Sequence, residues 1–388
     1  MHQTPRLANN LLKNPELPEA FIDALNSGFP EDLNILIMKT IIVIFPHSPE
    51  VQDIYIDSGL CMCLFDFLSS QSLPLLEASI ALVDTISESS GYGRDSVLCL
   101  GLHTFIIEIA KSEINEQITV QACESLSKIF SNKQHIDSNT LTSCVEPIAE
   151  LLSLHSVHAV YIILACFISM TNKLPALVFN MYDLNLFPVI VNFLHNPELI
   201  GMALPLIGNL SVGQSFHIKT LLDCGLFPLL MQLIQTEFTA DVYWVLSNIL
   251  ESVPQMTIGL FNPNFVAQTV EIAMTSSFEV KKEAAFFIAT LMLFTQNADL
   301  KYFKNEDVVD LMIEMLGCSS NLIVLRCLDA LLRFVHVNST TGDEEFLSLL
   351  QTKDLYNPLN NLIERGSHMI KERAEFLLCN LDATKSVI

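Results

Sequence analysis

The chain has 388 residues, with 20 basic and 43 acidic side chains and a formal net charge of −23. A single compact core rarely grows to this length, so the chain either splits into domains or builds an array whose units pack only on their neighbours. The charge argues against nucleic acid as a direct partner. The negative charge favours basic proteins and peptides as partners. Alternatively, it only keeps an apolar chain soluble.

The composition favours long helices with few turns. Glycine (13) and proline (16) are sparse, and 51% of the residues are hydrophobic. The polar N-terminal stretch Met1–Asn14 lacks the apolar core of a signal peptide. The longest apolar stretches, Ile35–Phe45 and Val157–Met170, are shorter than the ~20 residues of a membrane span. We therefore expect buried helices and no membrane partner.

Neither the cysteines nor the histidines form a pattern that indicates chemistry. The ten cysteines are scattered, and the side chains of the closest pair, Cys61 and Cys63, diverge on a helix. Gly91-Tyr92-Gly93 lacks the third glycine of a nucleotide-binding loop, and no nucleophile, zinc or calcium motif is present. We expect no enzyme, no cofactor and no metal site.

Two segments near the middle of the chain reveal an internal repeat. Leu186–Ile190 and Leu226–Leu230 share the pattern Leu-Phe-Pro followed by two aliphatic residues, each after a turn that contains Asn or Gly. Proline is tolerated in a first helical turn, where the missing N–H has no partner anyway. Both segments are therefore predicted to start a helix.

A later helix of each repeat carries a second recurring position. Asn209, Asn248 and Thr290 are aligned there, and the series extends at intervals of about 40 residues. The further positions are Val43, Asp84, Lys128, Ala165 and Arg333. This period predicts an all-α, armadillo/HEAT-like, right-handed superhelical solenoid of about 8–10 helical repeats. We expect one continuous solenoid over residues 17–383, between a short N-terminal segment (1–16) and a tail (384–388).

The middle third of this array resembles importin-α. The resemblance rests on Gly208-Asn209, on Tyr243–Ile249 and on Lys281–Phe286, with a weaker match over Ile80–Asp84 and Gly93–Leu98. The resemblance implies a groove lined by the third helix of each repeat. There, Trp and Asn one helical turn apart hold an extended Lys/Arg-rich peptide. Tryptophan rings flank the aliphatic stems and the charged heads, amides bind the main chain, and acidic residues pair with the cations.

The resemblance is uneven along the repeats, because only Trp244 and Asn248 form a complete pair. The minor, later site of the family is partly retained, and its expected peptide-binding residues are Asn209, Trp244, Ser247, Asn248, Glu283, Phe286 and Thr290. The major, earlier site is degraded. Its register holds non-aromatic residues at Lys39, Ile80 and Glu124, and the degenerate set is Ile80, Asp84, Glu88, Glu124 and Tyr161.

Each of these residues also has a purely structural interpretation. Trp244, the one tryptophan of the chain, fits a hydrophobic core as well as a groove. Gly208-Asn209 is a common helix terminator. In the structural interpretation, Glu283 is simply the exposed ion-pair partner of Lys281 or Lys282. Such a surface pair contributes little to stability.

The resemblance implies a nuclear import adaptor for basic (NLS-type) peptides or cargo, shuttling between cytoplasm and nucleus. Importin-β and an export factor would be further partners, but the family recruits importin-β through a long basic N-terminal segment. The first 30 residues carry only Arg6 and Lys13. If the protein starts at Met1, importin-β is not recruited in the usual way. The alternative is a protein–protein interaction scaffold derived from importin-α that no longer binds NLS peptides. The adaptor predicts a solvent-facing Trp244, and the scaffold predicts a buried Trp244 or a groove filled by the chain's own residues.

Overall fold

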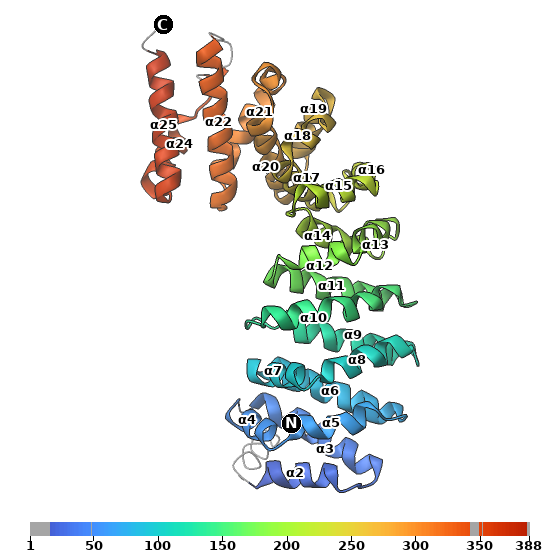
Figure 1. Ribbon diagram of the computed structural model, residues 1–388. Coiled ribbons are helices and arrows are strands. Elements are labelled where there is room, and N and C mark those ends of the chain that lie inside the picture. Colours follow the sequence, from blue (N-terminus) through green and yellow to red (C-terminus); the bar gives the residue numbers. More distant parts are fainter. Residues whose placement is uncertain (1–15, 48, 342–348, 351, 386–388) are drawn as a thin grey trace. The chain divides into compact units, whose positions relative to one another are not determined.

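The computed structural model describes residues 16–47, 49–341, 349–350 and 352–385. These residues form helices and connecting turns, with no strand among them (Figure 1). The chain divides into two compact units, Met1–Asn209 and Leu210–Ile388, each of which is described by itself.

Unit 1 is a stack of short helices joined by tight turns. Its helices are α2 (Leu17–Asn26), α3 (Glu31–Ile44), η1 (Phe45–His47), α4 (Pro49–Asp57), α5 (Leu60–Leu68), α6 (Leu73–Ser89), α7 (Gly91–Cys99), α8 (Leu102–Ser112), α9 (Glu116–Ser131), α10 (Ser138–Ala149), η2 (Glu150–Ser153), α11 (Val157–Lys173), α12 (Leu177–Asp183), α13 (Leu186–Asn192), η3 (Phe193–His195) and α14 (Ile200–Leu210), which ends at the boundary.

Unit 2 repeats the same plan. Its helices are α15 (Ser215–Asp223), α16 (Leu226–Leu233), α17 (Thr239–Ser252), α18 (Pro254–Thr257), η4 (Ile258–Leu260), α19 (Pro263–Thr275), α20 (Phe278–Phe294), η5 (Asn297–Phe303), α21 (Glu306–Met315), α22 (Asn321–Thr341), α24 (Tyr356–Arg365) and α25 (His368–Lys385).

The two Leu-Phe-Pro segments start helices, as predicted. α13 follows Asn185 (φ 56°) and α16 follows Gly225 (φ 82°), so a left-handed residue makes the turn in each case. Pro188 and Pro228 then lie in the first turn of these helices, where no intrahelical N–H bond is lost. The same short connection therefore recurs about one repeat apart.

The third helix of each repeat packs on the third helix of the next. In unit 1 the series runs α3, α6, α9 and α11, and in unit 2 it runs α17, α20, α22 and α25 (Figure 1). Residues one repeat apart on these helices are consequently neighbours in space. The predicted register therefore places its aligned positions side by side within each unit.

Both apolar stretches form helices, as expected, but the first is only partly buried, because Leu36 and Val43 are exposed. Ile35–Phe45 lies in α3 and η1, and Val157–Met170 lies in α11, whose buried side chains include Phe167 and Met170. Among the described residues no single helix is long and apolar enough to cross a membrane. One pair, Leu177–Asp183 with Leu186–His195, passes the length and composition test only when its two helices, bent by 91°, are taken together. The expectation of one continuous solenoid over 17–383 stays a prediction, and residues 1–15 and 386–388 lie outside the described residues.

Candidate peptide-binding face

Trp244 and Asn248 share one face of α17. Both side chains are half-buried, whereas Val245, Leu246 and Ser247 between them are fully buried. One turn of helix separates the two, so the indole and the amide lie on the same stripe. The structure therefore places Trp244 at the edge of the core, with part of its surface in solvent.

Three carboxylates lie near one another on α17 and on the neighbouring helix α20. Asp241 lies on the first turn of α17, and Glu279 and Glu283 lie at the start of α20, which packs on α17. Burial raises the pKa of Asp241, with a further contribution from Glu279. Burial also raises the pKa of Glu283, against the opposing effect of Lys282. Both carboxyl groups therefore lie in surroundings that disfavour their charged forms, and a cation brought close to them would lower these pKa values.

Lys282 is the cation closest to this cluster. Its Nζ lies 2.7 Å from Glu279 Oε1 and 3.5 Å from Glu283 Oε1, while Lys281 is paired with Glu314 on α21. The Glu283 side chain is 20% exposed, so it is more than a freely solvated surface partner. Lys282 thus pairs with two of the three carboxylates, Glu279 and Glu283.

Phe286, the aromatic residue predicted on α20, is covered by a side chain of the same unit. Only 7% of Phe286 is exposed. The Cζ atom of Arg326, on α22, lies 4.8 Å from the centre of the Phe286 ring, and the guanidinium also pairs with Glu251 near the end of α17. This is the cation–π arrangement that was expected for a bound peptide, made here by an internal arginine.

Two of the predicted peptide-binding residues belong to the core instead. Ser247 and Thr290 are completely buried, and each hydroxyl donates to the carbonyl one turn earlier, Ser247 to Tyr243 (2.8 Å) and Thr290 to Phe286 (2.8 Å). Thr290 stands at the aligned position and Ser247 one residue before it in its own repeat, but both side chains point into the interior. Neither hydroxyl contacts a peptide on the exposed face.

Asn209, in unit 1, joins two neighbouring helices. Its amide nitrogen donates to Thr171 Oγ1 (2.9 Å) and to Asn172 Oδ1 (3.0 Å), both at the end of α11. It is also the penultimate residue of α14, which agrees with the helix-terminator interpretation. Since both N–H groups are used within the unit, only Oδ1 can serve a peptide.

In the register of the degraded site, the chain supplies its own cation. Lys128 on α9 lies 2.9 Å from Asp84 Oδ2 and 3.6 Å from Glu88 Oε1, both on α6. Burial raises the pKa of Asp84, partly offset by hydrogen bonds from Ser125 and Lys128. Ile80 is completely buried and belongs to the core. These acidic residues therefore neutralise an internal lysine.

The other two residues of this set are accessible. Glu124 is exposed and Tyr161 is half-buried, on the neighbouring helices α9 and α11. Glu124 lines a shallow pocket of about 360 Å³ together with Glu116 and His158. These positions of unit 1 thus keep an accessible carboxylate and an accessible aromatic ring.

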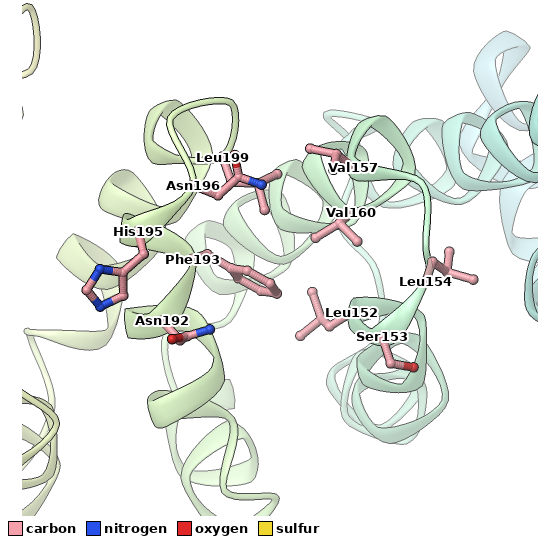
Figure 2. Close-up of a pocket in the computed structure, with 10 residues that line it drawn as sticks. All are labelled: Leu152, Ser153, Leu154, Val157, Val160, Asn192, Phe193, His195, Asn196 and Leu199. Atoms are coloured by element: carbon pink, nitrogen blue, oxygen red, sulfur yellow. The ribbon is translucent and has the colours of Figure 1, made fainter.

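A separate pocket of about 320 Å³ lies between neighbouring repeats of unit 1. Figure 2 shows Leu152, Val160 and Phe193 facing one another across it, while His195 points away. Its ten lining residues include no carboxylate and no residue of the predicted set. This apolar hollow is therefore separate from the predicted peptide-binding residues on the third helices.

The sequence reasoning missed Asp241, Glu251 and Arg326. Two of them carried a readable signal, because Asp241 and Glu251 stand three residues before and seven residues after Trp244 and so share its helical face. Arg326 likewise stands three residues before the aligned position Asp329, so its helical face could be predicted but its contact partners could not. Its contact depends on how far a long side chain reaches across helices.

The fold defines an armadillo-type helical-repeat protein. An engineered protein from a structural genomics programme matches with a TM-score of 0.74 and 16% identity, over 94% of this chain and 88% of that one. A designed armadillo repeat protein matches with a TM-score of 0.51 and 16% identity, over 60% and 99% of the two chains. Another, solved with the peptide (KR)4, matches with a TM-score of 0.52 and 15% identity, over 60% and 98%. No protein-family model and no curated protein matches the sequence.

Proposed function

We propose that the protein is a non-enzymatic armadillo scaffold that binds an extended basic peptide segment along α17 and α20. The observation that carries the proposal is the partly exposed Trp244–Asn248 stripe beside Asp241, Glu279 and Glu283. The indole would pack on the aliphatic stem of a lysine or arginine, and the carboxylates would hold its charged end. The net charge of −23 would speed the approach of such a ligand.

Two further points support a peptide as the ligand. A helical-repeat array presents an extended surface, which suits an extended chain better than a small molecule. A designed armadillo protein of the same fold was solved with the alternating basic peptide (KR)4. On the resemblance of Tyr243–Ile249 and Lys281–Phe286 to importin-α, we further propose an import adaptor for NLS-type cargo, present in cytoplasm and nucleus.

The test uses the single tryptophan. We would titrate the protein with (KR)4, follow Trp244 fluorescence at low and at physiological salt, and measure the same affinity by anisotropy of labelled peptide. A saturable change that persists at physiological salt, with binding lost in Trp244→Ala, supports the proposal. Tyr302→Ala, an exposed aromatic of η5 in the same unit, is the matched control and should bind normally. If binding is lost at physiological salt and is the same in Trp244→Ala, the interaction is an attraction between charges that does not involve the indole.

One observation favours the alternative scaffold. Arg326 and Lys128 fill positions on the third helices that a peptide cation would otherwise take. A scaffold that no longer binds NLS peptides would hold its partner through another surface. Absence of (KR)4 binding, together with unchanged fluorescence, would favour this second function.

A further inference from the structure

Three successive third helices of unit 2 meet at one guanidinium group. Arg326 extends from α22, stacks on Phe286 of α20 and pairs with Glu251 of α17. The Arg326 side chain is 19% exposed and that of Glu251 is 35% exposed. The contact is therefore semi-enclosed, and the ring below it is almost completely covered.

This contact lies in line with the proposed peptide-binding face. Glu251 stands seven residues after Trp244, which is about two helical turns along the same stripe of α17. A peptide that continues past Trp244 in that direction would reach Glu251, which pairs with the same guanidinium that stacks on Phe286. There it finds an arginine side chain already in place.

The chemistry of the contact is selective for arginine. A planar guanidinium can stack on a ring and donate to a carboxylate in the same plane, whereas an ammonium offers only a point charge. We propose that Phe286 and Glu251 form an arginine-binding slot and that Arg326 is its internal occupant. A ligand arginine enters only when Arg326 leaves, so Arg326 limits how far along α17 a basic peptide can bind.

The existence of the arginine-binding slot does not depend on the proposed function. The role of Arg326 in limiting peptide binding does rest on the proposed function. The first measurement therefore uses a small probe that does not need Trp244. N-acetyl-arginine methylamide, and its lysine counterpart, would be added to the full chain while the Tm is followed. The variants are Arg326→Ala, the double variant Arg326→Ala/Phe286→Ala, and Arg365→Ala. Arg365 is exposed at the end of α24, so its variant carries the same charge change with the slot still filled.

We expect a saturable rise in Tm with the arginine probe in Arg326→Ala alone, and a smaller rise with the lysine probe. The unmodified protein, Arg365→Ala and the double variant should show no such rise. If Arg326→Ala does not fold, Arg326→Lys decides, because it keeps a cation but loses the planar group. It should respond more to the arginine probe than the unmodified protein does. An equal rise in Tm in all variants, or a rise that persists when Phe286 is also replaced, would contradict the proposed arginine-binding slot.

The second measurement addresses peptide length. In Arg326→Ala the affinity for (KR)4 should rise about fivefold or more, the scale of one added cation–π contact. Arg365→Ala should leave this affinity unchanged. If the probe binds the opened slot but no variant binds (KR)4, the slot stands, while the proposed function and the limiting role of Arg326 fail. If (KR)4 binds equally to all variants, Arg326 does not limit the peptide.

Discussion

Lys128 Nζ lies 2.9 Å from Asp84 Oδ2, across two neighbouring third helices whose paired residues are 44 positions apart in the chain. Arg373 and Asp329 form the same kind of pair, also 44 positions apart, with 2.5 Å between Nε and Oδ1. Opposite charges one repeat apart therefore join successive repeats in both units. Because the Asp84 side chain is only 11% exposed, removing one partner of this pair should cost more stability than breaking a surface pair does.

Removing the lysine tests this. Lys128→Gln leaves Asp84 without its cation, and we expect the free energy of unfolding to fall by about 1–2 kcal/mol, the cost of an unpaired, partly buried charged group. Urea denaturation followed by circular dichroism measures it. Lys219→Gln is the matched control, because the Lys219–Asp223 pair is more than 60% exposed on both sides. Equal effects of the two substitutions would contradict a structural role for the Lys128–Asp84 pair.

The effect of Lys128→Gln should depend on pH in a defined direction. Burial already raises the pKa of Asp84, and loss of Lys128 should raise it further. A carboxyl whose folded pKa is raised destabilises the fold while it is charged. That penalty disappears as the pH falls through the folded pKa towards the unfolded value of about 3.9. The stability deficit of the variant should therefore shrink between neutral pH and pH 4, whereas Lys128→Gln/Asp84→Asn should show a flatter profile.

Peptide binding should weaken in acid. Burial raises the pKa of both Asp241 and Glu283 above their ordinary values, and a bound cation would favour their charged forms. Below neutral pH, binding of (KR)4 should therefore release protons, and its affinity should fall as the pH drops towards 5. Calorimetry in buffers of different ionisation enthalpy measures the released protons. An affinity that is constant between pH 5 and 7.5 would exclude these carboxylates from the binding face.

The fold could be predicted from the sequence because each repeat carries recognisable sequence patterns. Leu-Phe-Pro after a left-handed turn residue marked the start of α13 and α16, and the interval of about 40 residues marked the third helices. The helical interval between Trp244 and Asn248 predicted their common face correctly. Periodicity was sufficient at these points because each feature depends on local geometry alone.

The details of the site depend on contacts between repeats. Ser247 points into the core because it stands one residue before the aligned position Asn248, and a one-residue step on a helix rotates a side chain by about 100°. Thr290 occupies the aligned position itself and is nevertheless buried, so its burial depends on the packing of α20 and not on its register. The pairing of Asp84 with Lys128 was visible in principle, since aligned positions one repeat apart carry opposite charges. The stacking of Arg326 on Phe286 could not be predicted, because it depends on how far the arginine side chain reaches from α22 to α20.

A buried arginine holds one of the connections in unit 1. Arg94 on α7 is 1% exposed. Its guanidinium donates to the carbonyls of Gln134 (2.9 Å) and His135 (2.7 Å), in the connection after α9, and to Asp95 Oδ1 (2.7 and 2.9 Å). An ammonium cannot satisfy these acceptors in one plane. Arg94→Lys should therefore lower the free energy of unfolding by about 2–4 kcal/mol.

The control for Arg94 is an arginine without such contacts to buried carbonyls. Arg365→Lys, on the exposed end of α24, should change stability by less than about 0.5 kcal/mol. Urea midpoints of both variants give the comparison. If Arg94→Lys matches Arg365→Lys, the connection after α9 is held by something other than this guanidinium.

The reactivity of the cysteine thiols tests the helix packing within each of the two units. Cys99 and Cys379 are exposed, whereas Cys166 and Cys327 are completely buried. Burial raises the pKa of Cys123 to about 12 and that of Cys144 to about 11, and raises those of Cys166 and Cys327 as well. Since the thiolate is the reactive form, a buried thiol is protected both by its pKa and by lack of access.

We therefore expect two fast thiols per chain in the native protein at pH 8, and all ten only after unfolding in urea. Mass spectrometry after brief alkylation should assign the fast sites to Cys99 and Cys379, and Cys99→Ser/Cys379→Ser should abolish the fast phase. Cys224 and Cys318, which are half-buried, should follow more slowly. Fast labelling of Cys166 in unit 1 or Cys327 in unit 2 would mean that the third helices of that unit separate in solution, and the ring and ion-pair contacts described there would then be only transient.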